Sequence, residues 1–372
     1  MNAPKQILAE KFSFTSSIKA DVWQPKTNPK AFEWWYFDAL SEDGRDAVVI
    51  IFLDNFIFSP RYNSANRKHY RFADKLLKRK TLQWDNCFPA LAFTYYRDGK
   101  PVYRAINEFS PEDFTASQEN PSCQMGSNFF RLESAPYGLG YVLSINAKLR
   151  KNRHLEAHFE WLLIESDFLP DKALNKNDSH VWNLVVARAD VTGRISVADN
   201  KGKPEDIVHF RGTGYHDHNF DNRWLPETVS EWQWGRAHFA DATAIFYRYK
   251  EMGEANPTTK LFTVRDGALR DHDSDYEQQS FNRDKFGIKY PTRLRLATEG
   301  NISLRVEQSK IIDSSFFYLR FLSEMTLSLR DGKPRRAIGL TEYLSPKVLK
   351  YRWLDWLTNM RIGRGGKGSF LP

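Results

Sequence analysis

The alternation of apolar and polar residues along the chain predicts β-strands. In HLEAHFEWLLIES, five apolar side chains from Leu155 to Leu163 fall on one face, as in a strand with one solvated face. The run AVVIIFLDNFIF, residues 47–58, is too apolar for a strand with an exposed face. Further strands are expected in both halves of the chain, at GYVLSINAKLR, VWNLVVARADV, EWQWGRAHF, TAIFYRYK, ISLRVEQSKII and FFYLRFLSEMTLSL.

Short turn sequences separate these strands, and most of them contain Asp-Gly: SEDGRD, YRDGKP, DVTGRI, VRDGAL and LRDGKP. Glycine supplies the positive φ that tight hairpin turns require. Strands joined by short turns, with little helix, predict an all-β protein of antiparallel barrels or sandwiches. The pentapeptide RDGKP occurs at Arg97 and again at Arg330. Shared turn chemistry explains this repeat, which is also compatible with two similar β domains.

The length of 372 residues favours two domains, although no Gly/Ser-rich or Pro-rich linker marks a boundary. The loop FDNRWLPETVSEW, with Pro226, is the best candidate, giving domains at 1–225 and 226–372. The segment SPKVLKYRWLDWLTNMRIGRG begins with Ser345 and Pro346 and spaces apolar residues at Leu349, Trp353, Trp356, Leu357 and Met360. It predicts a C-terminal amphipathic helix packed against the core.

A second segment outside the β pattern, NRKHYRFADKLLKRK (residues 66–80), carries seven Lys or Arg residues against the single Asp74. If helical, it would have a narrow stripe of Tyr70, Leu76 and Leu77. The alternatives are a solvated surface helix, a lid element, or a peripheral membrane contact from Arg67 to Lys80.

Composition narrows the classes of function. Aromatic residues make up 15% of the chain, including 11 Trp and 27 Phe, which favours large apolar pockets or packing of sheet on sheet. The net charge of +8 comes from 54 basic and 46 acidic residues, and this modest excess predicts no nucleic-acid partner. Cys87 and Cys123 form neither a C-x-x-C pair nor a disulfide framework, which favours a reducing compartment. Because no export signal or membrane-spanning run is apparent, we expect a soluble cytoplasmic protein.

The densest polar cluster lies in GTGYHDHNFDNRW, residues 212–224. On an extended strand, Tyr215 and Asp217 share one face and His216 and His218 share the other. The histidine pair would suit a metal ion if His238 or Asp221 supplied a third ligand. The other pair would suit acid catalysis, because an aromatic pocket raises the pKa of a carboxyl group. A purely structural cluster, in which these groups hydrogen-bond to backbone, is the third alternative.

Two other stretches extend this cluster. In NDSHVWN, His180 and Trp182 share one strand face; alone they indicate a structural histidine beside a core indole, but with Tyr215 and Asp217 they supply a base and an aromatic face that stabilises a cation. In FEWWYFDA, alternation places Glu33, Trp35 and Phe37 opposite Trp34, Tyr36 and Asp38. A pocket wall and plain core fit this stretch equally well.

The blocks FEWWYFDALSEDGRDAVVIIF, FSPRY, GTGYHDHNF and EWQWGRAHFADATAIFY resemble, in this order, those of the carotenoid 1,2-hydratase family, which also includes lipocalin-like proteins of unknown function and fungal Diels–Alderases. The resemblance implies two lipocalin-like β domains, a hydrophobic substrate at or near their interface, and no metal or organic cofactor. The hydratases use an H-x-W pair and a Y-x-D pair, which here are His180 with Trp182 and Tyr215 with Asp217. Asn219, Phe220 and Asp221 replace the more usual Asn-Trp-Gly, so the resemblance does not fix a carotenoid as the substrate.

We therefore expect acid-assisted hydration or cyclisation of a carbon–carbon double bond in a long isoprenoid or polyene substrate. Asp217, oriented by Tyr215, would donate the proton, Trp182 would stabilise the cation, and His180 would activate water or take the proton back. Substrate contacts are expected from Glu33, Trp35, Phe37, Trp232 and Trp234. A pericyclic cyclase and a non-catalytic lipid carrier are the two alternatives.

Overall fold

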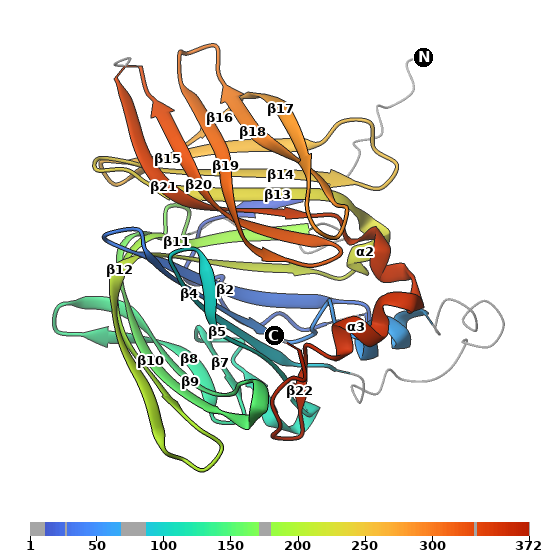
Figure 1. The fold of residues 1–372 in the computed structure, drawn as a ribbon. Coiled ribbons are helices and arrows are strands. Elements are labelled where there is room, and N and C mark those ends of the chain that lie inside the picture. The colour runs from blue at the N-terminus through green and yellow to red at the C-terminus, as the bar shows by residue number, and fades with distance from the viewer. Residues whose placement is uncertain (1–11, 27, 68–86, 171–179, 331–332, 372) are drawn as a thin grey trace.

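The computed structural model describes residues 12–26, 28–67, 87–170, 180–330 and 333–371. Within these residues the strands form two curled sheets that stack on each other (Figure 1). All neighbouring strands pair antiparallel except two short pairings, so the all-β class expected from the sequence is confirmed. The eight strand segments proposed from the sequence all contain strands.

The first sheet has thirteen strands among the described residues. In order of pairing they are β22 (Gly363–Arg364), β5 (Lys100–Glu108), β4 (Ala90–Arg97), β3 (Asp46–Leu53), β2 (Phe32–Ser41), β12 (Pro204–Asp221), β11 (His180–Ala198), β10 (His154–Ser166), β9 (Gly138–Lys148), β8 (Asn128–Ala135), β7 (Ser122–Met125) and β6 (Phe114–Ala116), with β1 (Phe12–Thr15) added in parallel to β11.

The second sheet has nine strands among the described residues. They are β16 (Ala268–His272), β15 (Thr258–Arg265), β14 (Thr243–Glu251), β13 (Val229–His238), β21 (Pro334–Leu344), β20 (Tyr318–Ser328), β19 (Ser303–Ser314), β18 (Lys289–Ala297) and β17 (Asp275–Arg283). The chain passes between the sheets through the short helix α2 (Leu225–Thr228), and β22 later returns to the first sheet. Two independent folding domains at 1–225 and 226–372 stay a prediction.

Helical segments are short. Residues 60–67 are helical, and 3-10 turns occur at Pro111–Asp113 and Arg150–Asn152. Of the basic segment 66–80, only Asn66 and Arg67 lie within the described residues, so its stripe of Tyr70, Leu76 and Leu77 and its membrane contact stay predictions. None of the helices that the structure describes is long and apolar enough to cross a membrane.

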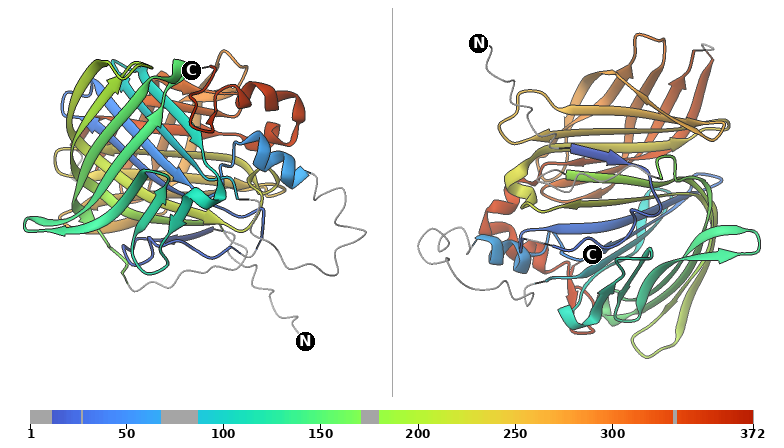
Figure 2. Two further views of the ribbon diagram at one scale, coloured as in Figure 1. Left: turned by 90° about the horizontal axis from the view of Figure 1, so that it is seen from below. Right: turned by 180° about the vertical axis from the view of Figure 1, so that it is seen from behind.

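The expected C-terminal helix is instead broken into three pieces: 3-10 turns at Pro346–Lys350 and Arg352–Leu354, and α3 at Asp355–Asn359. Leu349 is buried as expected, but Trp353 and Trp356 are 65% and 62% exposed. The break at Tyr351, which is extended, changes the face that the following residues present. The pieces still cover one end of the space between the sheets (Figure 2).

The turn predictions hold at SEDGRD, YRDGKP and VRDGAL, where Gly44, Gly99 and Gly267 have positive φ. The turn expected at DVTGRI is wrong, because β11 continues through it. Gly193 serves close packing there: a Cβ at this position would collide with the ring of Phe159. The central residues of LRDGKP fall outside the described part of the chain.

Three apolar layers result from this stacking. One lies inside the curl of the first sheet and includes Trp35 and Phe37. A second lies between the sheets and includes Tyr36 and Trp234, and a third fills the curl of the second sheet. Strand β2 faces the first two layers at once, so nine of its ten residues are buried. This placement explains why its sequence shows no solvated face.

Candidate functional site

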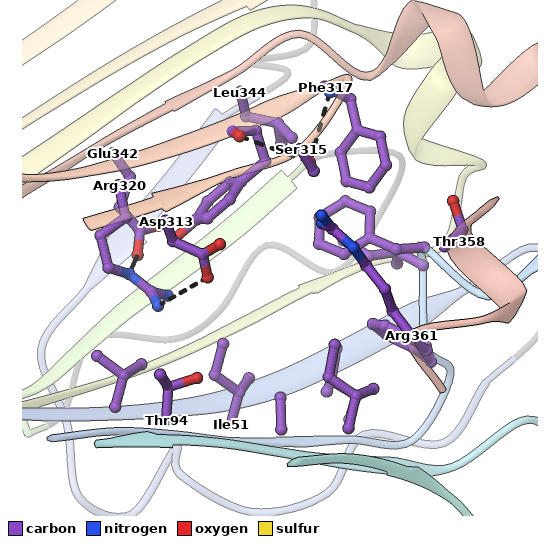
Figure 3. A pocket seen from close by; sticks show the side chains of 18 of the residues that line it. Ile51, Thr94, Asp313, Ser315, Phe317, Arg320, Glu342, Leu344, Thr358 and Arg361 are labelled. Atoms are coloured by element: carbon purple, nitrogen blue, oxygen red, sulfur yellow. Dashed lines mark hydrogen bonds and ion pairs between the residues drawn. The ribbon is translucent and has the colours of Figure 1, made fainter. Parts of the chain in front are cut away.

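A cavity of about 150 Å³ lies between the two sheets, closed at one end by the C-terminal segment (Figure 3). Its floor is apolar and comes from β3, β4 and β5, with Val49, Ile51 and Ile106 among the lining side chains. Aromatic side chains from both sheets, including Trp34 and Trp232, form further walls. The mainly apolar lining of this cavity suits an apolar ligand.

One side of this cavity is charged. Arg320 donates from Nε to Glu342 at 2.9 Å and from a terminal nitrogen to Tyr96 at 3.0 Å. Arg104 pairs with Asp313 at 2.9 Å. These residues come from β4, β5, β19, β20 and β21, and their carboxylates compensate the two guanidinium groups. No local motif in the sequence identifies this group, because its residues lie far apart in the chain.

The four residues proposed as catalytic lie together on the face of the first sheet that meets the second. Asp217 is fully buried and accepts three hydrogen bonds. Its Oδ2 accepts from the Tyr215 hydroxyl at 2.8 Å and the Trp182 indole at 3.1 Å, and its Oδ1 accepts from the Asn219 amide at 2.9 Å. Strands β11 and β12 are paired, with Asp217 opposite Leu184. The pair His180 and Trp182 on β11 therefore lies next to the pair Tyr215 and Asp217 on β12.

Burial raises the pKa of Asp217 to about 8, because removal from water disfavours the anion. The hydrogen bonds from Tyr215 and Trp182 act in the opposite direction but do not outweigh desolvation. At neutral pH the side chain is therefore mainly a neutral carboxylic acid that can donate a proton.

His180 lies two residues before Trp182 on the same strand face, in a stack of aromatic rings. Its Nε2 is 2.7 Å from the hydroxyl of Tyr247, and its ring stacks on Tyr249 at 5.0 Å between centroids. Trp182 stacks on the same Tyr247 at 4.5 Å. Desolvation, followed by the nearby charge of Arg223, lowers the pKa of His180 to about 3, so the imidazole is neutral.

Tyr247 therefore contacts both members of the His180–Trp182 pair, and Trp182 in turn donates a hydrogen bond to Asp217, although no motif in the sequence gives Tyr247 a role. The alternation in TAIFYRYK places Tyr247 and Tyr249 on one face, which is the only local signal for them. That signal identifies a strand face, while contact with His180 depends on how the second sheet packs on the first.

Asp217 does not line the cavity itself. A layer of aromatic side chains separates the cavity from the cluster around Asp217. Trp34 and Trp232 line the cavity, and their rings lie 6.2 and 6.4 Å from the His180 ring, measured between centroids. Tyr36, also in the lining, lies 6.4 Å from the ring of Tyr215. The acid cluster and the cavity are thus neighbours separated by one side-chain layer.

His216 and His218 point to the opposite face, into the core of the first sheet, as strand alternation predicts. The His216 ring stacks on Phe37 at 3.8 Å, and its Nε2 is 3.0 Å from Asp21. His218 Nε2 is 2.7 Å from Glu33. Burial alone would raise the pKa of Asp21, but the two histidines hold it at about 2.

Of the metal ligands considered from the sequence, His238 lies on the second sheet and bonds to Thr243, and Asp221 pairs with Arg223. Among the side chains that the structure describes, no group of three or more His, Cys, Asp or Glu residues is placed to hold a metal ion.

The expected substrate contacts divide between the two layers. Glu33, Trp35 and Phe37 face the core of the first sheet, where Glu33 pairs with Lys26 and Trp35 stacks on His218, so they do not line the cavity. Trp232 lines it, and Trp234 lies behind the lining residue Tyr36 at 5.4 Å.

The cavity thus uses the other face of β2. Asp38, on that face, forms a fully buried ion pair with Arg236 of β13 and so connects the two sheets beside the site.

The chain matches one protein family and one relative of similar length. The family model for carotenoid hydratase CrtC matches residues 166–370, more than half of the chain, including all four proposed catalytic residues. A hydroxyneurosporene dehydrogenase from Chlorobaculum tepidum is 28% identical over 365 residues, covering 96% of this chain and 94% of that protein.

Two solved structures share the lipocalin-like fold. CghA with Sch210972 has a TM-score of 0.56 at 14% identity, covering 85% of this chain and 89% of that one. A putative AttH from Nitrosomonas europaea has a TM-score of 0.53 at 13% identity, covering 85% and 92%.

Proposed function

Because the chain belongs to the carotenoid hydratase family, we propose that it hydrates or cyclises a carbon–carbon double bond in a long apolar isoprenoid or polyene substrate held between the two sheets. The observation that carries this proposal is Asp217: a fully buried carboxylic acid with a pKa of about 8, surrounded by aromatic rings and next to an apolar cavity. An alkene is a weak base, so its protonation needs an acid that still holds its proton at neutral pH and a cation site that water does not reach.

In the proposed reaction, Asp217 transfers its proton to the less substituted alkene carbon, leaving a tertiary carbocation. The indole face of Trp182 and the phenol ring of Tyr247 stabilise that cation, since their π faces carry negative charge. In hydration, water attacks the cation and then loses one proton. In cyclisation, a second double bond of the substrate attacks instead, and the ring carbon next to the new cation loses the proton.

The proton is returned to Asp217 rather than to His180. After the first step Asp217 is an anion whose conjugate acid has a pKa of about 8, whereas His180 has a pKa of about 3. Asp217 is the stronger base of the two, and the neutral His180 orients the attacking water by a hydrogen bond. Each turnover of hydration then consumes one water and regenerates the acid.

Access requires one local rearrangement. The ring of Trp34 or Tyr36 separates the cavity from the acid cluster, so a bound substrate reaches Asp217 when one of these side chains turns aside. A Trp34→Ala variant should therefore accept bulkier chain ends than the unchanged protein.

The test is an incubation with acyclic isoprenoid polyenes that end in a trisubstituted double bond, in water enriched in ¹⁸O. Hydration gives a product that carries one ¹⁸O atom, and cyclisation gives an isomer of the substrate. Asp217→Asn should abolish both, and Asp266→Asn, at an exposed turn, should have no effect. Turnover that survives Asp217→Asn with a flat pH profile would indicate a pericyclic cyclase, and binding without turnover would indicate a carrier.

A further inference from the structure

The charges on the cavity walls do not balance. Three arginines line the cavity, Arg104, Arg320 and Arg361, against two carboxylates, Asp313 and Glu342. Arg104 and Arg320 each have a carboxylate partner at 2.9 Å. With all five groups ionised, the cavity therefore carries one excess positive charge, and that charge belongs to Arg361.

Arg361 follows α3 and enters the cavity from the side of the C-terminal segment, away from the charged group around Arg320 (Figure 3). Its one hydrogen bond within the described chain runs from a terminal nitrogen to the carbonyl of Ser314, at 3.3 Å. Its Nε is buried and has no hydrogen-bond partner among the described residues, and Asp313, which pairs with Arg104, acts on the guanidinium as a more distant opposite charge.

The surroundings of Arg361 offer its guanidinium little compensation for the ion pair that it lacks among the described residues. The cavity lining near it is mixed: Phe317, Leu357 and Ile362 are apolar, whereas Ser315 and Thr358 carry hydroxyl groups. Desolvation lowers the pKa of Arg361 from its usual value, and the attraction of Asp313 does not outweigh this effect. A half-buried guanidinium with free donors at the edge of an apolar cavity can bind a planar anion such as a carboxylate, because the hydrogen bonds are charge-assisted.

We propose that Arg361 binds an acidic end group of the substrate, so that the natural ligand is an isoprenoid or polyene acid rather than a pure hydrocarbon. This inference rests on the proposed function, which supplies the apolar chain of the substrate. It adds that the substrate carries an acidic group at one end of that chain. A carboxylate on Arg361 neutralises the excess charge, while the apolar chain extends along the floor formed by Val49 and Ile51 toward the aromatic layer in front of Asp217.

The test compares farnesoic acid with farnesol, which share one isoprenoid chain and differ in the end group. Binding is measured by titration calorimetry at about pH 7.5, where a carboxyl group is ionised. The unchanged protein should bind farnesoate about tenfold or more tightly than farnesol, as one charge-assisted hydrogen-bonded pair provides. Arg361→Gln should remove most of this preference, Arg361→Lys should keep part of it, and Arg352→Gln, exposed on the same segment, should keep all of it.

Equal or tighter binding of farnesol to the unchanged protein would overturn the proposal, as would a full acid preference in Arg361→Gln. If Arg361→Gln fails to fold by circular dichroism, the comparison of the two ligands on the unchanged protein and on Arg361→Lys still decides. Turnover of a neutral polyene without any acid preference would refute this inference and leave the proposed function intact. A preference for the acid without turnover of any polyene would support this inference and refute the proposed function.

Discussion

Replacing Asp217 by Asn tests whether this carboxyl group is a neutral acid in the folded protein. The pKa is about 8 in the fold, against 3.8 for an ordinary aspartate. At pH 7 the unfolded chain therefore carries an ionised Asp217, whereas the folded protein retains the proton. Each unit of pKa difference corresponds to about 1.4 kcal/mol, and about three units separate 3.8 from pH 7, so the unchanged protein loses roughly 4 kcal/mol of unfolding free energy.

Asparagine avoids this cost because it does not ionise. The site can accommodate it: the Oδ1 of Asn219 has no partner among the described residues, so a flip of that amide would let it accept a hydrogen bond from Asn at position 217. Allowing about 1 kcal/mol for an imperfect hydrogen bond, we expect Asp217→Asn to be more stable than the unchanged protein by about 2–4 kcal/mol at pH 7 and to be inactive.

The sign of the pH dependence follows from the direction of the shift. A carboxyl group whose pKa is raised by folding reduces stability as pH rises from the unfolded value toward the folded value. The stability advantage of Asp217→Asn should thus be absent near pH 4, grow between pH 4 and 8, and level off above pH 8. Urea unfolding at a series of pH values measures it, with Asp266→Asn as the control. A difference that does not change with pH would show that Asp217 is ionised in the fold and would refute its role as proton donor.

Three further changes test the surroundings of the site. Tyr215→Phe removes a hydrogen bond that lowers the pKa of Asp217, so activity should fall while its alkaline limit moves above pH 8; a downward movement in the pH–rate profile would contradict this. Ile51→Trp fills the cavity and should weaken ligand binding at least tenfold in calorimetry while circular dichroism stays unchanged; unaltered binding would place the ligand elsewhere. Arg236→Met leaves Asp38 unpaired between the sheets and should cost about 3 kcal/mol in urea unfolding, and adding Asp38→Asn should recover most of it; no recovery would mean that lost packing, not charge, is responsible.

The sequence by itself determined the fold class and which residues of the site share a strand face. Strict alternation in HLEAHFEWLLIES identifies a strand, and the same period places Tyr215 with Asp217 and His216 with His218 on opposite faces of β12. The side-chain period of a strand is a local property, so it needs no knowledge of the rest of the chain. It does not say which face meets a cavity.

That choice is tertiary, and β2 shows why. Trp34 and Tyr36 line the cavity, while Trp35 and Phe37 fill the core of the first sheet. Both faces of this strand are buried, so both are aromatic, and the contrast between polar and apolar faces that would distinguish them in the sequence is lost.

The charged residues that line the cavity could not be predicted from the sequence either. Arg320, Glu342 and Arg361 belong to segments separated by many residues from the floor of the cavity, and they meet it only when the second sheet packs on the first. The raised pKa of Asp217 has the same origin: its sequence neighbours are polar, and desolvation comes from the packing of β13 and β14 against β11 and β12. The order of residues determines which side chains share a strand face, and the stacking of the two sheets decides which of those faces is closed off from water.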